Sequence, residues 1–160
     1  MKSQKIAIGL VAVALFVGSV TTHATDFDVG YEAYLRGDYS TALRVFRQLA
    51  DQGEAEAQNI LGIMYDQGQG VTQDYTEGTR WYRKAAEQGN TNAQYNLGIM
   101  YDNGRGVAQD YVQAHMWFNL AAAKGGAFHM AMRDRLAEKM TPAQIAEPQR
   151  LAREWKPKGK

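Results

Sequence analysis

The chain reads AQNILGIMYD at residues 57–66 and AQYNLGIMYD at residues 93–102. The two stretches lie 36 positions apart, and Leu-Gly-Ile-Met-Tyr is identical in both. The same interval relates Gly-x-Gly-Val at 68–71 to 104–107, Asp-Tyr at 74–75 to 110–111, and Trp81 to Trp117. A repeat of this length predicts copies of one small unit stacked in a row, because one copy alone cannot bury its apolar face.

The first half of each unit is predicted to form a helix. Ala57, Leu61 and Tyr65 recur at every fourth position, so they share one apolar face of that helix. Gly62 and Gly98 stand inside the helices, where glycine costs about 1 kcal/mol relative to alanine. We therefore expect the backbone of a second helix to approach closely at these two positions.

Each unit continues with a turn and a second helix. Gly68 and Gly104 are expected to end the first helices in the left-handed conformation. An aspartate then precedes each aromatic-rich run and is predicted to cap the second helix, with a glutamate or glutamine three positions later completing a capping box in the two full copies. These aspartates are Asp38, Asp74 and Asp110. The second helices place Trp81 and Trp117 on their inner side, so both indoles are expected in the core.

A degenerate copy at 25–54 precedes the full copies at 55–90 and 91–126, and residues 127–156 follow as capping helices. An apolar stripe with helical spacing is predicted to cover the preceding unit; it consists of Phe128, Met132, Leu136 and Met140. Thr141 and Pro142 are suited to begin another helix, in which Pro148 predicts a break or a kink near Glu147. The basic residues 157–160 are expected to form a solvated tail.

The first 24 residues have the pattern of an export signal. Lys2 and Lys5 precede twelve apolar residues, 6–17, which as a helix span about 18 Å, well short of the roughly 20 residues that cross a bilayer. Small residues then predict cleavage between Ala24 and Thr25. The chain would be periplasmic or secreted, with no stable membrane insertion after cleavage. An uncleaved tethering helix is the alternative.

Composition excludes several classes of function. The 160 residues are 45% hydrophobic and 22% charged, as expected of one compact domain. Eighteen basic and seventeen acidic residues give a net charge of +1, which argues against a nucleic-acid partner. The absence of cysteine excludes disulfides, thiolate catalysis, cysteine-bound zinc and an acylated cysteine. No cofactor is expected.

The sequence offers no recognisable catalytic arrangement. After residue 24 the chain has one serine, Ser40, and two histidines, His115 and His129, so a Ser-His-Asp set would have to span two or three repeats. The histidines lack both the HExxH spacing and a partner cluster, and no metal site is expected. A hydrolase acting on cell-wall or β-lactam substrates is the alternative to a binding protein.

The motifs at 57–89 are Ala-x-x-x-Leu-Gly-x-x-Tyr, Gly-x-Gly-Val-x-x-Asp-Tyr and Trp-Tyr-x-Lys-Ala-Ala-x-x-Gly, with a near copy at 93–125. They resemble the Sel1-like repeat, a relative of the tetratricopeptide repeat. The second copy departs from the first at Asn119 and Leu120, which replace Arg83 and Lys84. The resemblance implies an all-α, right-handed solenoid of antiparallel helix pairs with about three and a half repeats, of an exported bacterial type. It also implies an adaptor that binds other proteins, and it brings no catalytic residue.

The candidate binding residues lie on the first helices. With the Ala57 stripe turned inward, Asn59 and Ile63 face the far side of the helix, and Tyr95 and Ile99 hold the equivalent places in the next copy. First helices line the concave face of tetratricopeptide-like stacks, so these four residues are the candidates for holding an unknown protein or peptide. In the alternative interpretation they only pack against the neighbouring first helix. Self-association through the solenoid ends is a further alternative.

Overall fold

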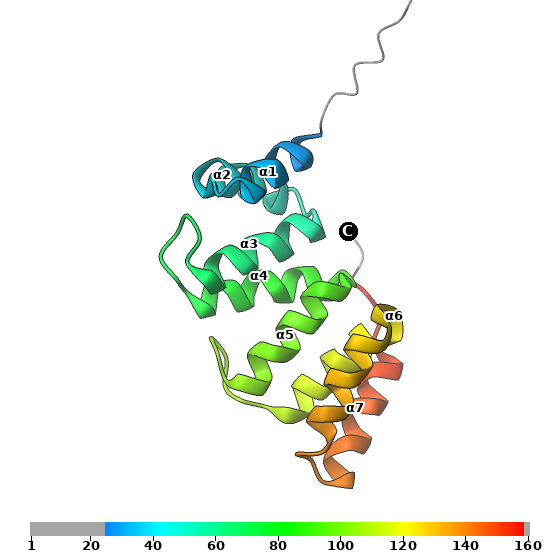
Figure 1. Cartoon of the computed structure of the whole chain (residues 1–160). Helices are drawn as coiled ribbons and strands as arrows, with labels where there is room; N and C mark the ends of the chain where they lie inside the picture. Colours follow the sequence, from blue (N-terminus) through cyan, green and yellow to red (C-terminus); the bar gives the residue numbers. More distant parts are fainter. Residues whose placement is uncertain (1–24, 159–160) are drawn as a thin grey trace, which may run out of the picture.

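The computed structural model describes residues 25–158, and within that range it contains seven helices and no strand. The helices are α1 (Asp26–Leu35), α2 (Tyr39–Asp51), α3 (Ala55–Gln67), α4 (Tyr75–Glu87), α5 (Thr91–Asn103), α6 (Tyr111–Ala137) and α7 (Pro142–Glu154). They form hairpins that stack in sequence order (Figure 1). The predicted all-α solenoid is confirmed. The export signal predicted at 1–24 lies outside the described residues.

The first helices end where the repeat pattern predicts. Gly68 follows α3 with φ of 69°, and Gly104 follows α5 with φ of 66°. Each glycine donates its backbone N–H to the carbonyl of a methionine in the last turn, Met64 or Met100. This left-handed closure turns the chain towards the second helix of the same repeat.

The second helices begin at the predicted aspartates, but the capping box is only half formed. Asp74 accepts from the backbone N–H groups of Thr76 and Glu77. Asp38 and Asp110 cap α2 and α6 through one such bond each, from the residue three positions later. The Glu77 carboxylate does not turn back to the cap. It accepts instead from the indole Nε1 of Trp81 at 2.8 Å and from the guanidinium of Arg80.

The glycines inside α3 and α5 make room for an aromatic ring. A Cβ on Gly62 would lie 2.6 Å from the ring of Tyr82, and one on Gly98 would lie equally close to the ring of Phe118. Both rings are buried and belong to the second helix of the same repeat. The expected close approach of a second backbone is seen beside Gly62, because a Cβ on Gly78 of α4 would lie 3.1 Å from the Gly62 carbonyl oxygen. The space that the missing Cβ itself leaves is filled by a side chain at both glycines.

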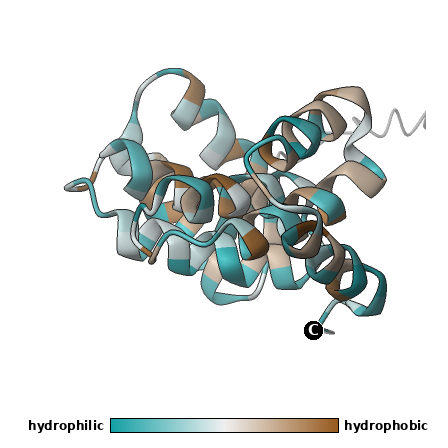
Figure 2. Ribbon diagram, turned by 90° about the horizontal axis from the view of Figure 1, so that it is seen from below, coloured by the Kyte–Doolittle hydropathy of each residue, from teal (hydrophilic) through white to brown (hydrophobic). Residues whose placement is uncertain are grey.

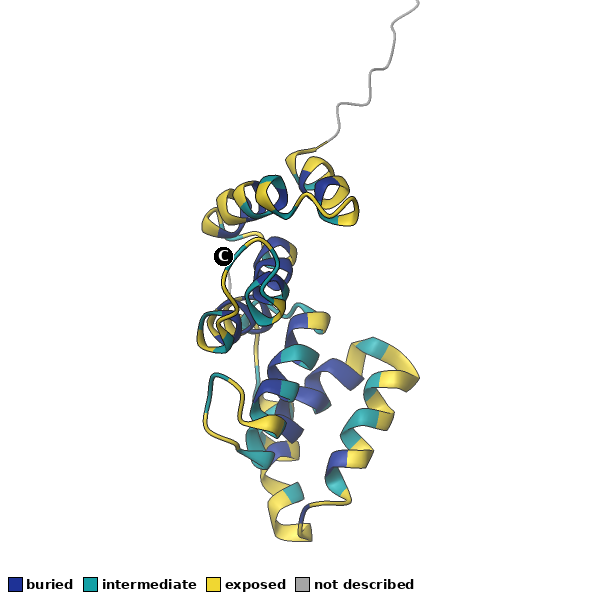
Figure 3. Cartoon of the chain, turned by 60° about the vertical axis from the view of Figure 1, so that its left-hand side comes forward, coloured by how far each residue is buried: buried dark blue, intermediate teal, exposed yellow. Residues whose placement is uncertain are grey.

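The core runs along the inner faces of the hairpins. Trp81 and Trp117 are 4% and 6% exposed, as predicted. Hydrophobic residues gather where the helices face one another (Figure 2), and buried residues follow the same faces (Figure 3). Among the described residues, no helix is both long and apolar enough to cross a bilayer.

The C-terminal helices differ from prediction in two respects. Gly126 has φ of 71° and ψ of −163°, so α6 is two helical segments that meet at a bend. Beyond the bend Leu136 and Met140 are buried, whereas Phe128 is 58% exposed and meets the preceding repeat through the ring of Tyr95, with the centroids 5.3 Å apart. The segment after the bend therefore reaches the core with its far end, while its first turn, 126–128, is exposed.

Of the break or kink predicted near Glu147, the break is wrong, because α7 continues through Pro148, and the kink stays a prediction. The ring of Pro148 is buried against the fold. Gln144, whose carbonyl loses its helical donor to the proline, is exposed, so water can reach that oxygen.

Helix α7 also explains where the second repeat departs from the first. Leu120 is 9% exposed, whereas its equivalent Lys84 is exposed. Leu120 and Asn119 face Ala152 and Arg153 of α7 across a shallow cavity. The two departures therefore lie where the capping helix packs.

Candidate functional site

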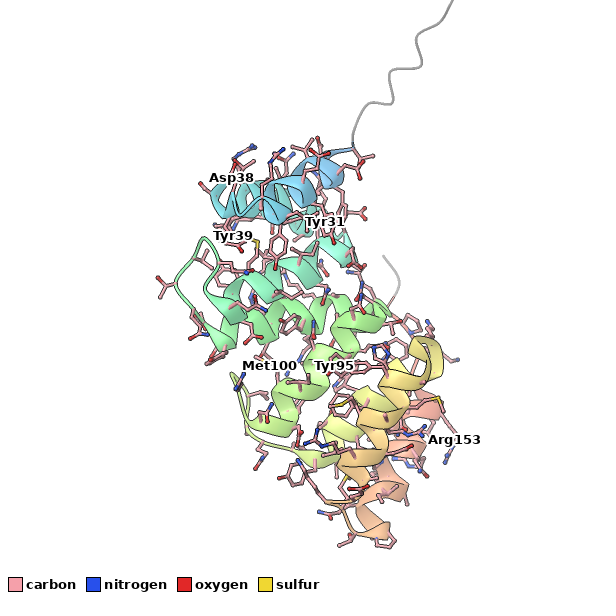
Figure 4. The ribbon with its side chains drawn as sticks, in the orientation of Figure 1. Tyr31, Asp38, Tyr39, Tyr95, Met100 and Arg153 are labelled. Atoms are coloured by element: carbon pink, nitrogen blue, oxygen red, sulfur yellow. The ribbon has the colours of Figure 1, made fainter. Side chains whose placement is uncertain are left out.

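The first helices of three successive hairpins enclose a cavity of about 330 Å³, which we call the groove. It is lined by α1 (Tyr31, Tyr34), α3 (Glu56, Asn59, Ile60, Ile63) and α5 (Asn92, Tyr95, Asn96). Tyr31 and Tyr95 come from the helices on either side of α3 (Figure 4). First helices therefore form the recessed face, as expected of this kind of stack.

Helical periodicity brings the groove residues to one face of each first helix. On α3 they occupy positions 56, 59, 60 and 63, which follow the i, i+3, i+4, i+7 spacing of a single helical face. The groove residues of α5 hold three of the same places, 36 positions later. Leu61 and Leu97 lie on other faces of these helices and are fully buried in the core. Stacking alone thus aligns equivalent side chains into a continuous recess.

Three of the four predicted binding residues line the groove. Ile63 and Tyr95 are half-buried there, whereas Asn59 is only 3% exposed. The side-chain oxygen of Asn59 accepts from Nδ2 of Asn96 at 3.1 Å, which links α3 to α5. Ile99 does not line the groove; it packs against the cluster around Phe118. Contact between neighbouring first helices, the alternative interpretation, is thus seen for Asn59, whereas Ile99 packs against a cluster formed by α6 and Met140.

Six residues of the groove were not among the sequence candidates. Glu56 and Ile60 would follow from extending the Asn59–Ile63 stripe by one turn, and Asn92 and Asn96 are their equivalents in the next repeat. Tyr31 and Tyr34 come from the degenerate copy, where the interval shortens to 32 because Gly30 corresponds to Gly62. With that offset Tyr31 takes the place of Ile63. The repeat register could therefore have identified Tyr31, but only through the least regular copy.

The groove is a nearly neutral surface rich in hydrogen-bonding groups. Glu56 is the one charged residue among those that line it. Burial raises the pKa of the Tyr95 phenol, and burial likewise raises the pKa of Tyr34, so both hydroxyls stay protonated at physiological pH. The amides of Asn92 and Asn96 add donors and acceptors, and Ile60 and Ile63 add apolar contact area.

Aromatic neighbours hold Tyr95 in position. Its ring centroid lies 5.7 Å from that of Phe118, 5.3 Å from that of Phe128 and 5.3 Å from that of His129. Contacts at these separations favour one orientation of the ring. The α5 wall of the groove is thus supported from the C-terminal side before any partner binds.

The histidines have local structural partners. His115 is 1% exposed, and its Nδ1 lies 3.0 Å from Nδ2 of Asn119. Nδ1 of His129 lies 2.7 Å from the carbonyl oxygen of Gly125. Ser40 is exposed in the first turn of α2. Within residues 25–158, no group of three or more histidine, cysteine, aspartate or glutamate side chains is arranged to hold a metal ion.

Comparison with known proteins identifies the repeat. A family model of the Sel1 repeat matches residues 55–90 and 91–126. A protective antigen present in uropathogenic Escherichia coli strains, displaying an SLR fold, is 34% identical with a TM-score of 0.77, over 81% of this chain and 29% of that chain. A Sel1 repeat protein from Oxalobacter formigenes is 32% identical with a TM-score of 0.66, over 80% and 55% respectively. No curated protein matches.

Proposed function

This chain belongs to the Sel1-like repeat family, whose fold generally serves as a scaffold for interactions between proteins, and on that premise we propose that it binds a protein partner through the groove of α1, α3 and α5. The observation that carries the proposal is the composition of the groove. It combines three tyrosines and two isoleucines with three asparagine amides on a recessed face. Aromatic anchors in concave surfaces contribute a large part of the binding energy in protein interfaces.

We propose that the partner binds as an extended segment. The groove crosses three first helices, α1, α3 and α5, and an extended chain, which advances about 3.3 Å per residue, can contact all three with few residues. The amides of Asn92 and Asn96 can pair with the backbone of such a segment, and the apolar side chains can meet Ile60, Ile63 and Tyr31.

Site-specific photo-crosslinking tests this function. A photoreactive residue at Tyr31 or Asn92, which are both exposed, should capture the same partner in the native cell envelope. The control places the same group at Arg44, an exposed residue of the second helix α2. A second substitution on the opposite wall, Asn92→Lys with the photoreactive residue at 31, should abolish capture at 31. Equal capture from Arg44, or capture that Asn92→Lys leaves unchanged, would contradict groove binding.

Tyr95 and Ile99 are less suitable probes. Both side chains pack against the cluster around Phe118. A double alanine variant would therefore disturb the fold as well as the groove.

We further propose that the protein works after export, with cleavage between Ala24 and Thr25. The support is the basic start, short apolar run and small residues of segment 1–24. N-terminal sequencing of the protein from the cell envelope should find Thr25 first. A protein that begins at Met1 and stays in the cytoplasm would contradict export.

We propose binding without catalysis as the mode of action. His115 and His129 each have a partner within α6, which supports a structural role for both side chains. Purified protein should leave the chromogenic β-lactam nitrocefin unchanged. Turnover above that of a heat-denatured sample would favour the hydrolase alternative.

A further inference from the structure

Beyond α7 the chain crosses back over the solenoid. Trp155 ends the helix with an extended backbone, φ of −66° and ψ of 138°, and residues 156–158 after it belong to no helix or strand. Lys158 donates its backbone N–H to the carbonyl oxygen of Glu87 at 2.7 Å, and its ammonium lies 2.8 Å from the Glu87 carboxylate. The ring of Trp155 meets that of Trp117 edge-on, with the centroids 6.3 Å apart. Segment 155–158 is thus held at both ends.

These contacts skip a repeat. In a solenoid each unit normally touches only the units before and after it. Segment 155–158 follows the last hairpin, yet it reaches α4 and the turn after it, with Pro157 and Trp155 lying over Gly89. It therefore links the last hairpin to repeat 55–90 across the whole of repeat 91–126.

Segment 155–158 contacts an aromatic residue of the second full repeat, Trp117, and an acidic residue of the first, Glu87. Differences between the two repeat sequences explain why it lies at this place. In the first repeat the Trp81 ring is already covered, with the Arg80 guanidinium 4.4 Å and the Lys84 ammonium 4.3 Å from its centroid. In the second repeat the equivalent positions hold Met116 and Leu120, which leaves the Trp117 ring to Trp155.

The acidic contact residue is present in only one of the two full copies. Glu87 closes α4, whereas its equivalent in the second copy is Ala123. A lysine that follows the tryptophan at the spacing of Lys158 finds a carboxylate only at the α4–α5 turn. The combination of Trp117 and Glu87 therefore selects one place on the edge of the stack.

We propose that Glu87, Gly89 and Trp117 form a second binding surface, separate from the groove, which recognises an extended aromatic-x-Pro-Lys segment and is occupied by this chain's own residues 155–158. Bound to this surface, segment 155–158 joins α7 to α4, and we call it the strap. The strap also fixes the turn from which α5 departs, and α5 carries Asn92, Tyr95 and Asn96 into the groove.

The strap is assembled from several modest contacts. The Lys158 side chain is 71% exposed and that of Glu87 is 30% exposed, so the ion pair alone contributes little. The backbone bond to Glu87 adds a donor for one of the carbonyls that a helix C-terminus leaves unpaired. Ring contact between Trp155 and Trp117 supplies the apolar part.

A charge-reversal cycle on the full chain tests the strap. Glu87→Lys and Lys158→Glu should each lower the melting temperature by about 2–4 °C, and the double variant should recover at least half of that loss. Near-ultraviolet circular dichroism should lose the signal of the tryptophan pair in each single variant and regain it in the double variant. Trp155→Ala sets the value for complete loss of that signal.

Two matched controls accompany the cycle. Asp51→Lys makes the same charge change at the repeat-equivalent end of α2, where no strap lies, and it should show no coupling to Lys158→Glu. Lys156→Glu changes an exposed residue of the same segment and should leave the tryptophan signal unchanged. Additive single effects, or equal coupling at Asp51, would overturn the proposal. Since no groove ligand takes part, this outcome is independent of the proposed function.

Analytical ultracentrifugation establishes which chain provides the strap. A monomer that shows the tryptophan signal is expected. A dimer that loses this signal on dilution would show that the segment is exchanged between two chains, and it would overturn the assignment to the chain's own residues.

Discussion

Gln58 and Gln94 occupy the same place in successive repeats, yet only one has both of its side-chain atoms paired. Each donates Nε2 to a carbonyl of the preceding second helix, Gln58 to Ala50 at 3.0 Å and Gln94 to Ala86 at 3.2 Å. The oxygen of Gln58 accepts from Gln88 at 2.8 Å, whereas that of Gln94 is buried without a partner. A buried carbonyl left unpaired costs about 1–3 kcal/mol.

Lys124→Gln is expected to stabilise the protein. Lys124 stands at the repeat equivalent of Gln88, so a glutamine there can donate to the unpaired oxygen of Gln94. The free energy of unfolding measured in urea should rise by about 1 kcal/mol. Lys124→Ala, which removes the lysine without adding a donor, is the control. A gain of the same size in the alanine variant would show that the amide pairing is not the cause.

His115 should make stability depend on pH below neutrality. Burial lowers the pKa of this histidine, and Arg133 lowers it further against a smaller opposing effect of Asp134. The folded state therefore binds the proton more weakly than the unfolded state, whose histidine pKa is about 6.5. Its contribution to stability is complete above that pH and is lost as the pH falls below it, at no more than about 1.4 kcal/mol per pH unit.

The matched variant is His115→Thr, which introduces the residue found at equivalent position 79. Its urea stability should vary less between pH 7 and pH 5 than that of the original protein. The comparison uses the slope with pH, because the smaller side chain changes the absolute stability. Equal slopes would place the proton uptake elsewhere.

At the scale of elements, the loop after each first helix fastens one repeat to the preceding hairpin. A Cβ on Gly70 would lie 2.8 Å from the carbonyl oxygen of Tyr39, and one on Gly106 would clash with the backbone of Tyr75 and Thr76. Thr79 adds a bond from its hydroxyl to the carbonyl oxygen of Arg105 at 3.1 Å. The Gly-x-Gly-Val pattern therefore reflects contact between units as much as the turn itself.

Gly106→Ala should consequently destabilise the stack by about 2–4 kcal/mol, since the obstacle is backbone that cannot move aside. Gly37→Ala serves as the control for backbone strain. It also has a positive φ, of 79°, but nothing lies within 4 Å of its Cβ position, so a loss of about 1–2 kcal/mol is expected. The free energy of unfolding of both variants is measured in urea. Equal losses in the two variants would show that the clash with the backbone is not the cause.

Local periodicity predicted most of the elements, and the errors have local causes. The helix ends at Gly68 and Gly104 and the caps at Asp38, Asp74 and Asp110 follow from residues a few positions apart. Pro148 does not break α7, and its ring is buried against the fold, which the pattern of the helix alone does not show. Phe128 is more exposed than its stripe predicts, because after the bend at Gly126 its ring lies against Tyr95 at the surface and not in the core.

The residues that line the groove were predicted only as far as the repeat register extends. Asn59, Ile63 and Tyr95 were found through that register, whereas Tyr31 lies in the copy with the shortened interval. Ile99 was assigned to the groove because a pattern gives the helix face but not what covers it. The contact between Lys158 and Glu87 has no periodic signal at all, because it joins a non-repeating segment to a repeat.

For the whole molecule, the two ends of the stack are secured differently. The C-terminal hairpin is tied back to Glu87, while α1, the first helix of the described residues, leaves Val29 44% and Leu35 67% exposed. Stability in such stacks is roughly the sum of contributions from each unit and its contacts with neighbours. The hairpin of α1 and α2 has a neighbouring unit on one side only in the described part of the chain.

Amide hydrogen exchange under native conditions should therefore be fastest in α1 and α2. The helices from α4 to α7 should open together at a higher free energy, because segment 155–158 joins their two ends. In the Glu87→Lys variant, exchange in α7 should approach that of α1. Uniform protection along the whole stack would contradict this division.

The strap also bears on how such a chain could lengthen during evolution. An added copy of 55–90, inserted before residue 91, would bring its own glutamate to the turn that meets the last hairpin. An added copy of 91–126 would bring Ala123 to that turn and leave the lysine without its anion. Duplication of the first full unit would thus keep the contact between the strap and a glutamate, whereas duplication of the second would remove it. Inherited length variants should therefore favour duplication of the first full unit.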